Sequence, residues 1–434
     1  MDCRRIRKGR SMQMIKLNLD HCTCKEHVFE HEQEILAIHQ QIHEKKCLGN
    51  DFLGWLNYPN EIDFEMVENI KKMAQCVQQD CDILVVIGIG GSYLGAKAGI
   101  DAINGLYPQK KLEIVYVGNT LSPTYTAQLY QYLKGKKIAL NVISKSGTTI
   151  ESAIAFRIIQ PLVEKAFKEK ANEYIFVTTD KQKGALKQIA LEKNYPTFII
   201  PSDIGGRYSV FTPVGLFPMA CAGIDIDALI QGAQAATQLY GKASLKENTA
   251  YQYAMSRFLC YQKGFPVEFF ITYEPHFQAF NEWLKQLFGE SEGKEQKGIL
   301  PHSLCFTTDL HSMGQFCQQG NPIFFETTIR FAHYQQDLLI PTSFQNLDQL
   351  DDLIHKPLSY VNDIAIDSTI EAHFSGNKEN LVLEVLQMDA YHLGELFYFF
   401  MKACACSALL LKVNPFNQPG VEVYKANMKE RFKK

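Results

Sequence analysis

Patterns typical of buried strands and of helices alternate along the chain from about residue 65 to residue 201. Short apolar runs predict strands with both faces buried, and the segments between them carry apolar residues at helical spacing. The expected strands are Ile83–Ile87, Ile114–Val117, Ile138–Ile143, Tyr174–Thr178 and Thr197–Ile200. Alternation with short connections predicts a parallel sheet covered by helices on both faces, with a ligand crevice at the carboxyl ends of the strands.

A second unit with the same layout begins near residue 248. Its expected helices are Ala250–Lys263 and His276–Phe288, and its expected strands are Val267–Thr272, Ser303–Thr307 and Ile323–Arg330. The connecting segment, residues 204 to 245, is predicted to be mostly helical. The longest apolar stretch, Leu396–Leu411, contains Lys402 and predicts a core helix rather than a membrane span.

One polar loop joins the strand Ile138–Ile143 to a predicted helix at Ile150–Ile159. It carries four hydroxyl groups and one ammonium group, with no acidic residue, over Ser144, Lys145, Ser146, Gly147, Thr148 and Thr149. Backbone N–H groups at the start of a helix lack partners, and the helix dipole favours negative charge there. A serine or threonine N-cap would need only one of these hydroxyls. The segment therefore predicts a phosphate-binding loop.

A second loop between a strand and a helix lies at Gly88–Gly95. Its glycines allow a ligand to approach the backbone closely, which first suggests a dinucleotide site. However, the third glycine of that fingerprint would fall at Tyr93, and the next strand ends without an acidic residue for a ribose. We therefore expect Gly90, Gly91 and Ser92 to form the floor of a site for a smaller ligand, beside the first loop.

Composition and charge narrow the class of protein. At 434 residues the chain can form two or three domains, and its net charge of −3 gives no electrostatic support for nucleic-acid binding. Its 12 cysteines are irregularly spaced, which is typical of reduced thiols in the cytoplasm. Residues 1–13 are rich in arginine, but no apolar segment of a signal peptide follows. We expect residues 1–14 to be a disordered or non-native extension, and the protein to be cytoplasmic without membrane partners.

Histidine and cysteine residues are concentrated near the N-terminus. They are His21, Cys22, Cys24, His27, His31, His39, His43 and Cys47. Their spacing matches no zinc module, and many glutamates lie among them, so we predict a charged amphipathic helix without a metal ion.

The second unit and the C-terminus contain three further candidates. Glu290 lies in the glycine-rich turn Gly289–Lys294 at a helix end, where a loop with unusual backbone angles can hold a carboxylate in a cleft. His311 is expected near the start of a helix, and Lys425 in a short final helix. Considered singly, such residues are most often an exposed acidic turn, a structural histidine and a solvated lysine.

Taken together, several motifs make the chain resemble phosphoglucose isomerase in its bacterial form, in order and over nearly the whole chain. They are GIGGSYLGAKA, SKSGTT, GGRYSVFTPVGL, FGESEGK, TTDLHSMGQ and VEVYK. The resemblance implies two sugar-isomerase (SIS) domains, each an αβα sandwich with a parallel sheet, at residues 65–205 and 248–412. It also implies a helical N-terminal segment at 15–64, a helical linker at 206–247 and a C-terminal helix within 413–434.

The resemblance also implies roles for particular residues. It implies interconversion of glucose 6-phosphate and fructose 6-phosphate in glycolysis and gluconeogenesis, without a cofactor, by a homodimer with active sites at the subunit interface. The family's catalytic base, arginine, lysine and histidine fall on Glu290, Arg207, Lys425 and His311, and the histidine comes from the neighbouring subunit. The phosphate ligands fall on Ser92, Ser144, Ser146, Thr149 and the backbone of Lys145, and the substrate lies near the backbone of Gly90, Gly91 and Gly206.

Two alternatives remain open. An isomerase of the same fold that acts on mannose or amino-sugar phosphates would share the phosphate loop, although the complete GESEGK and VEVYK segments argue against it. A non-catalytic sugar-phosphate sensor would keep SKSGTT but would not need Glu290. Such a sensor typically carries a basic DNA-reading module, for which this sequence gives no sign.

Overall fold

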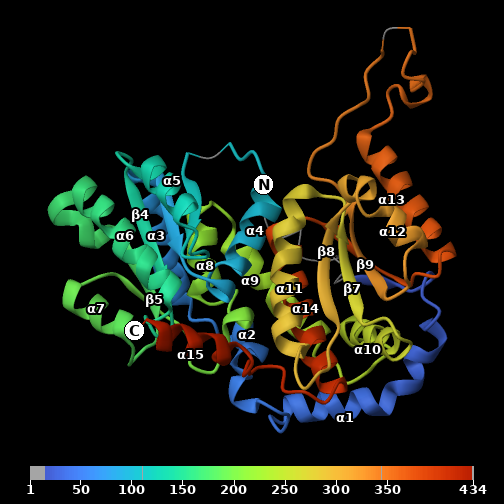
Figure 1. Ribbon diagram of the computed structural model, residues 1–434, viewed down its shortest axis with the longest axis horizontal. Coiled ribbons are helices and arrows are strands. Elements are labelled where there is room, and N and C mark those ends of the chain that lie inside the picture. Colours follow the sequence, from blue (N-terminus) through green and yellow to red (C-terminus); the bar gives the residue numbers. More distant parts are fainter. Residues whose placement is uncertain (1–14, 110, 344, 433–434) are drawn as a thin grey trace, which may run out of the picture.

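Two five-stranded sheets lie side by side in the chain, and helices pack on both of them (Figure 1). The computed structural model describes residues 15–109, 111–343 and 345–432. The extension expected at residues 1–14 lies outside the described residues. The α/β class with parallel sheets agrees with the sequence prediction.

The first sheet is entirely parallel, in the order β3-β2-β4-β5-β6. Its strands are β2 Ile83–Ile87, β3 Glu113–Val117, β4 Ile138–Ile143, β5 Ile175–Thr179 and β6 Thr197–Ile199. All five predicted strands are confirmed, with shifts of one residue at some ends. The two faces of β2 enter different apolar clusters: Leu84 and Val86 pack in one, and Ile83, Val85 and Ile87 in the other.

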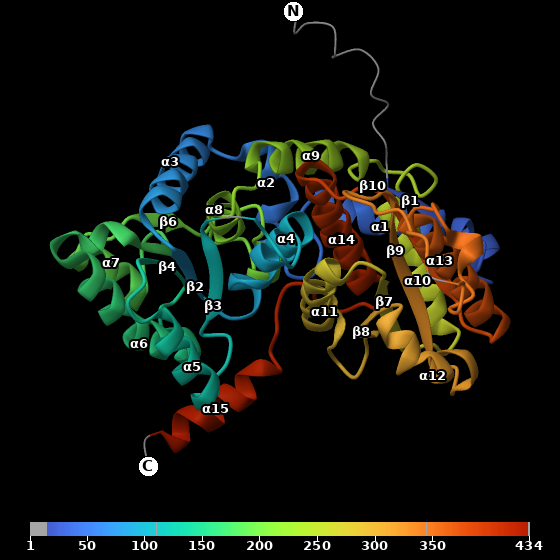
Figure 2. The same cartoon turned by 90° about the horizontal axis from the view of Figure 1, so that it is seen from above.

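Helices cover both faces of this sheet (Figure 2). They are α3 Phe64–Asp80, α4 Leu94–Asn104, α5 Pro123–Leu133, α6 Ile150–Phe167, α7 Ala185–Lys193 and α8 Pro213–Cys221. The loops after β2 and β4 both open helices at the carboxyl edge of the sheet, α4 and α6 respectively. The two loops predicted to bind the ligand therefore lie on neighbouring strands of one edge.

The second sheet has the order β1-β10-β9-β7-β8, and only β1 is antiparallel to its neighbour. Its strands are β1 Lys16–Asn18, β7 Val267–Thr272, β8 Leu300–Cys305, β9 Phe324–His333 and β10 Asn380–Gln387. Neither β1 nor β10 was predicted, and β1 lies in the N-terminal segment that was expected to be helical. The predicted strand Ser303–Thr307 is observed as β8, which begins earlier, at Leu300, and ends at Cys305. The prediction missed its first residues because this half of the edge strand is largely exposed and lacks an apolar run.

The remaining helices connect and cover the second sheet. They are α1 Glu32–His43, α2 Tyr58–Glu61, α9 Ile226–Leu239, α10 Thr249–Gln262, α11 Gln278–Glu292, α12 Gly314–Gln319, α13 Leu358–Ser375, α14 Ala390–Leu410 and α15 Val421–Arg431. Helix α14 is long and apolar enough to cross a membrane, but its apolar window is completely buried inside the chain. It is the core helix that the sequence predicts.

A lysine of α14 is buried beside two histidines of α1. Lys402 has no exposed surface, and its Nζ lies 2.7 Å from Nε2 of His43. The His43 ring stacks on that of His39, with centroids 4.1 Å apart. Burial lowers the pKa of Lys402 to about 7, and burial together with the charge of Lys402 lowers the pKa of His43 to about 3. A neutral His43 therefore accepts a hydrogen bond from Lys402.

We expect Lys402→Met to remove a pH-dependent part of the stability. The ordinary pKa of lysine, 10.5, applies to the unfolded chain, and the folded value is about 7. Between these pH values the unfolded state binds more protons, so this lysine makes the free energy of unfolding rise with pH, by at most about 1.4 kcal/mol per unit. Below pH 7 its destabilising effect is complete and constant.

Urea unfolding of wild type and Lys402→Met from pH 6 to pH 10 measures this effect. The stability of the methionine variant relative to wild type should be greatest at or below pH 7 and should fall as the pH rises. Lys72→Met, which replaces an exposed lysine of α3, is the control. If the difference in the free energy of unfolding between Lys402→Met and wild type stays constant from pH 6 to pH 10, the pKa of Lys402 is not lowered by burial.

Candidate active site

The SKSGTT loop joins β4 to α6, as the sequence predicts. The hydroxyl oxygen of Ser144 accepts from the N–H of Gly147 at 3.0 Å, and that of Ser146 accepts from the N–H of Thr148 at 3.2 Å. Thr149 is the N-cap residue of α6, but its side chain makes no capping hydrogen bond. The first two hydroxyls therefore shape the loop, and the Thr149 hydroxyl is available to a ligand.

A cavity of about 510 Å³ opens at this loop, and all five predicted phosphate ligands line it. They are Ser92, Ser144, Lys145, Ser146 and Thr149. Nζ of Lys145 donates to the carbonyl oxygen of Ser202 at 2.8 Å, and burial lowers the pKa of this ammonium group. Asp180 also lines the cavity, where its carboxylate accepts two backbone hydrogen bonds. Hydroxyls, a cation and a helix start thus converge on one space, which suits an anionic group.

Glu290 and Arg207 are in direct contact. Nη1 of Arg207 lies 3.1 Å from Oε2 of Glu290. The Arg207 side chain is 2% exposed and that of Glu290 is 30% exposed, so only the carboxylate reaches solvent. Arg207 also donates to the hydroxyl of Ser291 at 2.9 Å and to the carbonyl oxygen of Pro415 at 2.6 Å. A rigidly held cation therefore lies beside an accessible carboxylate.

The expected loop around Glu290 is in fact helical at its start. Helix α11 continues to Glu292, so Glu290 lies in its last turn. The unusual backbone angles come afterwards, with positive φ at Glu295, Gln296 and Gly298. The helix extends through Gly289 because Ser291 and Glu292 have completely buried side chains that anchor the last turn.

Glycines of the Gly88–Gly95 loop, which lies beside the SKSGTT loop, bring its backbone close to Glu290. A Cβ on Gly91 would lie 2.2 Å from the carbonyl carbon of Gly206, so these two residues meet main chain to main chain. A Cβ on Gly90 would lie 2.7 Å from Nε2 of Gln286, which donates to Oε1 of Glu290 at 3.1 Å. The three predicted glycines therefore lie between the hydroxyl-lined cavity and the Arg207–Glu290 pair.

The structure does not bring His311 or Lys425 into this network. His311 ends a 3-10 helix, Thr308–His311, and is exposed without a hydrogen-bond partner among the described residues. Nζ of Lys425 pairs with Glu422 at 2.8 Å, and its side chain is 48% exposed. Its helix, α15, projects from the body of the chain (Figure 2). Within one chain, two of the four predicted catalytic residues therefore stand apart from Glu290.

Sequence reasoning missed two glutamines that hold the Arg207–Glu290 pair. Gln286 lies one turn before Glu290 on α11, and this spacing on one helix face was a local signal for it. Oε1 of Gln418 accepts from Nη1 of Arg207 at 2.9 Å across 211 residues of sequence, and no local pattern could have revealed that contact.

Lys294, the last residue of the GESEGK motif, joins the end of α11 to the segment before α15. Its Nζ donates to the carbonyl oxygens of Ser291 and Asn414, at 2.8 and 2.5 Å. Burial, and then the neighbouring charge of Arg207, lower the pKa of Lys294 to about 8. This lysine fixes the end of α11 to the segment that precedes α15.

A buried ion network anchors the same helix end. Arg257 of α10 pairs with Glu268 at 2.7 Å and with Glu292 at 2.6 Å, and none of the three side chains is exposed. Its guanidinium group lies 3.9 Å from the ring centroid of Phe288. Glu292 is therefore a structural carboxylate with no access to a substrate.

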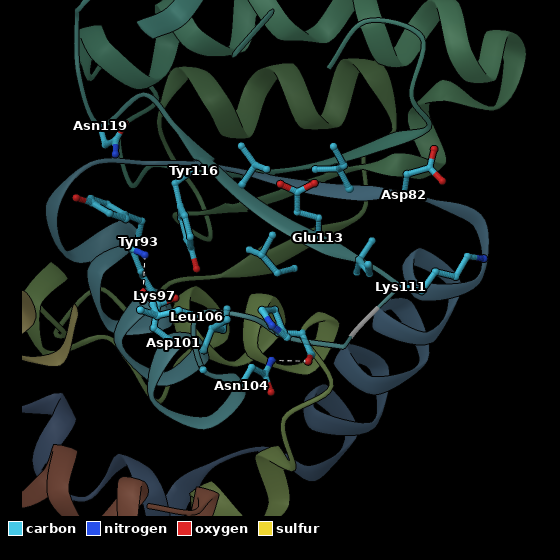
Figure 3. Close-up of a pocket in the computed structure, with 18 of the residues that line it drawn as sticks. Asp82, Tyr93, Lys97, Asp101, Asn104, Leu106, Lys111, Glu113, Tyr116 and Asn119 are labelled. Carbon is cyan, nitrogen blue, oxygen red and sulfur yellow. Dashed lines mark hydrogen bonds and ion pairs between the residues drawn. The ribbon is translucent and has the colours of Figure 1, made fainter. Parts of the chain in front are cut away.

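A larger cavity, of about 940 Å³, lies beside β3 and α4 (Figure 3). Lys97 and Asp101 form an ion pair there at 2.5 Å, and burial raises the pKa of Asp101. The hydroxyl of Tyr116 is buried, and no described residue forms a hydrogen bond with it. None of the predicted site residues lines this cavity.

The two sheets of mainly parallel strands, with a hydroxyl-lined loop on one and a carboxylate–guanidinium pair beside the other, define a protein of the sugar-isomerase (SIS) fold. The family model for phosphoglucose isomerase matches residues 66–433. The chain therefore belongs to the phosphoglucose isomerase family and is an enzyme of that type. The resemblance stated from the motifs is confirmed.

Curated relatives and solved structures agree with this assignment. The chain is 48% identical over 424 residues to glucose-6-phosphate isomerase of Mycoplasma mobile, covering 96% of this chain and 98% of the relative. It is 50% identical over 407 residues to glucose-6-phosphate isomerase of Staphylococcus aureus, covering 93% and 92%. A hypothetical protein from Thermus thermophilus has a TM-score of 0.88 at 27% identity, covering 96% of this chain and 100% of that one. A glucose-6-phosphate isomerase from Chlamydia trachomatis, with a TM-score of 0.77 at 20% identity and coverage of 94% and 86%, shares the fold.

Proposed function

We propose that this isomerase interconverts D-glucose 6-phosphate and D-fructose 6-phosphate, in glycolysis and gluconeogenesis, as a cytoplasmic enzyme without a metal or organic cofactor. The observation that carries the proposal is the contact of Arg207 with the partly exposed carboxylate of Glu290, next to glycine loops that lead to a hydroxyl-lined cavity. A base, a cation and an anion cradle are the groups that the reaction needs.

Glu290 acts as the base in the proposed mechanism. Aldose–ketose isomerisation removes a proton next to a carbonyl group, and the resulting enediolate needs a positive or donating group nearby. Glu290 moves the proton between C1 and C2, and Arg207 faces the developing negative charge. Gln286 and Arg207 each hold one carboxylate oxygen of Glu290, which fixes its direction.

The phosphate group is bound away from the reacting carbons. Ser92, Ser144, Ser146, Thr149 and the backbone of Lys145 hold it, and the binding energy positions C1 and C2 against Glu290. In the proposed division of the chain, these ligands belong to residues 65–205 and Glu290 to residues 248–412. Gly90, Gly91 and Gly206 bring the two parts close enough for one substrate.

Ring opening is assigned to His311 and Lys425, and the proposal places His311 of a neighbouring subunit at each site. The support is that His311 is exposed and makes no contact with Glu290 of its own chain. A projecting arm between β9 and α13 offers the dimer contact (Figure 1). Its leucines are unusually exposed, with Leu338 at 76%, Leu339 at 63% and Leu347 at 78%. Apolar side chains on such a segment are typical of an interface.

Removing hydroxyls from the SKSGTT loop is expected to weaken phosphate binding. The double variant Ser144→Ala and Thr149→Ala should raise KM for both sugar phosphates, and should lower kcat as well if the phosphate orients the reacting carbons. Steady-state kinetics in both directions measure the effect. Thr124→Ala is the control, since Thr124 is exposed on α5 and does not line the cavity. Unchanged kinetics in the double variant would remove the phosphate from this loop.

Hydrogen exchange with solvent tests the proposed reaction and separates it from sensing. In D₂O, an enediol intermediate should replace the C2 hydrogen of glucose 6-phosphate with deuterium at a rate comparable with turnover, which NMR follows directly. Binding of the sugar phosphate without exchange or isomerisation would establish the sensor instead. A substrate panel with mannose 6-phosphate and glucosamine 6-phosphate tests the other alternative, and faster turnover of either would replace the proposed substrate.

A further inference from the structure

Three cysteine side chains from two distant segments converge beside the second sheet. Cys22 and Cys24 lie between β1 and the 3-10 helix Lys25–His31, and Cys260 lies on α10. Their sulfur atoms all lie within 4.8 Å of one another, and the described residues contain no second group of this kind. The three residues are 4%, 7% and 0% exposed, respectively.

The turn that carries Cys22 and Cys24 has a fixed backbone. The N–H of Cys22 donates to the carbonyl oxygen of Leu19 at 3.0 Å, and the N–H of Lys25 donates to that of Cys22 at 3.1 Å. The carbonyl oxygen of His21 accepts from the N–H of Asn380, at the start of β10, at 2.8 Å. Both thiols are therefore held facing α10 in the folded chain, where Cys260 meets them.

A lysine lies beside the three thiols. Thr23, between the two cysteines, donates its N–H to the carboxylate of Glu379 at 2.6 Å, and Lys263 pairs with the same carboxylate at 2.6 Å. An ammonium group and a carboxylate therefore lie next to the cluster, whose thiols bind metals in their deprotonated form.

We propose that Cys22, Cys24 and Cys260 bind one Zn²⁺ ion through their three sulfur atoms. Zn–S bonds of about 2.3 Å place sulfurs about 3.8 Å apart in a tetrahedral site, so a contraction of at most about 1 Å completes the arrangement. Thiolates select zinc over the oxygen-seeking Mg²⁺ and Ca²⁺. Three thiolates and one divalent ion carry a net charge of −1, and the adjacent charges of Lys263 and Glu379 offset each other.

The bound ion would fasten the N-terminal segment to the second sheet. Strand β1 has three residues and pairs only with the edge of β10. A metal that joins the turn after β1 to α10 would add a strong link where few backbone hydrogen bonds exist. The sequence prediction of no metal considered only the spacing within the N-terminal segment, and it missed Cys260 because that residue comes from far along the chain.

Cobalt is the spectroscopic probe for this site. The full-length protein, reduced and freed of metal with a chelator, is titrated with Co²⁺ and then with Zn²⁺. We expect one Co²⁺ per chain, with sulfur-to-cobalt charge-transfer absorption in the near ultraviolet and the visible bands of a tetrahedral site. Zn²⁺ should abolish both signals and raise the Tm of the protein. Isomerase activity is not a readout, so the result is independent of the proposed function.

Cysteine variants identify the ligands. Cys24→Ser and Cys260→Ser should lose the charge-transfer absorption, and Cys76→Ser, at an exposed cysteine outside the cluster, should keep it. The wild-type titration remains decisive if a variant does not fold by circular dichroism. A folded, fully reduced wild type without the absorption would overturn the proposal, as would absorption that survives in folded Cys24→Ser and Cys260→Ser. A disulfide among the three thiols in protein purified without reductant, with no cobalt signal after reduction, would establish redox pairing instead.

Discussion

Replacing Glu290 with glutamine is expected to lower kcat by about 10²- to 10⁴-fold in both directions, with little change in affinity for the sugar phosphate. Glutamine has nearly the same size and can still accept a hydrogen bond from Arg207, and the amide of Gln286 can rotate to meet the new side chain. It cannot take a proton from carbon at neutral pH. The loss should therefore appear in kcat, because the phosphate ligands are unchanged.

Three measurements on Glu290→Gln separate catalysis from binding: steady-state kinetics, deuterium exchange at C2, and titration with fructose 6-phosphate. Glu295→Gln is the matched control, because Glu295 directly follows the GESEGK motif with a side chain that is 66% exposed. Exchange by Glu290→Gln at the wild-type rate would mean that another group is the base. Glu292 could not be that group, since it is fully buried against Arg257 at 2.6 Å.

The first sheet could be predicted from the sequence because burial on both faces produces uninterrupted apolar runs such as Ile83–Ile87. The second sheet was harder to predict from the sequence, for two reasons. The first half of β8 lies exposed at an edge, so polar residues interrupt its pattern. Strand β1 is three residues long and pairs Lys16 with Glu384, so its existence depends on a contact that no local sequence contains.

The candidate site was likewise predictable only in part. Glu290 and the hydroxyls of SKSGTT lie in compact motifs whose chemistry is visible locally. The contacts that position Glu290 come from elsewhere: Arg207 reaches it across 83 residues of sequence, and Gln418 reaches Arg207 across 211. The helical conformation at Glu290 was also not predictable, because glycine on either side suggests a loop. The buried side chains that stabilise the last helical turn depend on tertiary packing.

Of the single substitutions proposed here, Arg257→Leu is expected to lower the free energy of unfolding most. It removes the cation between Glu268 and Glu292, two carboxylates with no exposed surface. Breaking a buried ion pair by removing one partner typically costs about 3–5 kcal/mol, because an uncompensated charge remains in the interior. The loss of contact with the Phe288 ring adds to this cost.

Urea unfolding at fixed protein concentration measures the change, with the exposed Arg157→Leu of α6 as the control. A triple variant that combines Arg257→Leu with Glu268→Gln and Glu292→Gln should recover part of the stability, because no buried charge then lacks a partner. If the triple variant is no more stable than Arg257→Leu, packing rather than charge explains the loss. If Arg257→Leu unfolds at the same urea concentration as wild type, the ion network of Arg257, Glu268 and Glu292 does not anchor α11. We also expect Arg257→Leu to lower kcat, because the buried Glu292 anchors the last turn of α11 and thereby positions the carboxylate of Glu290. The triple variant should then regain part of this kcat.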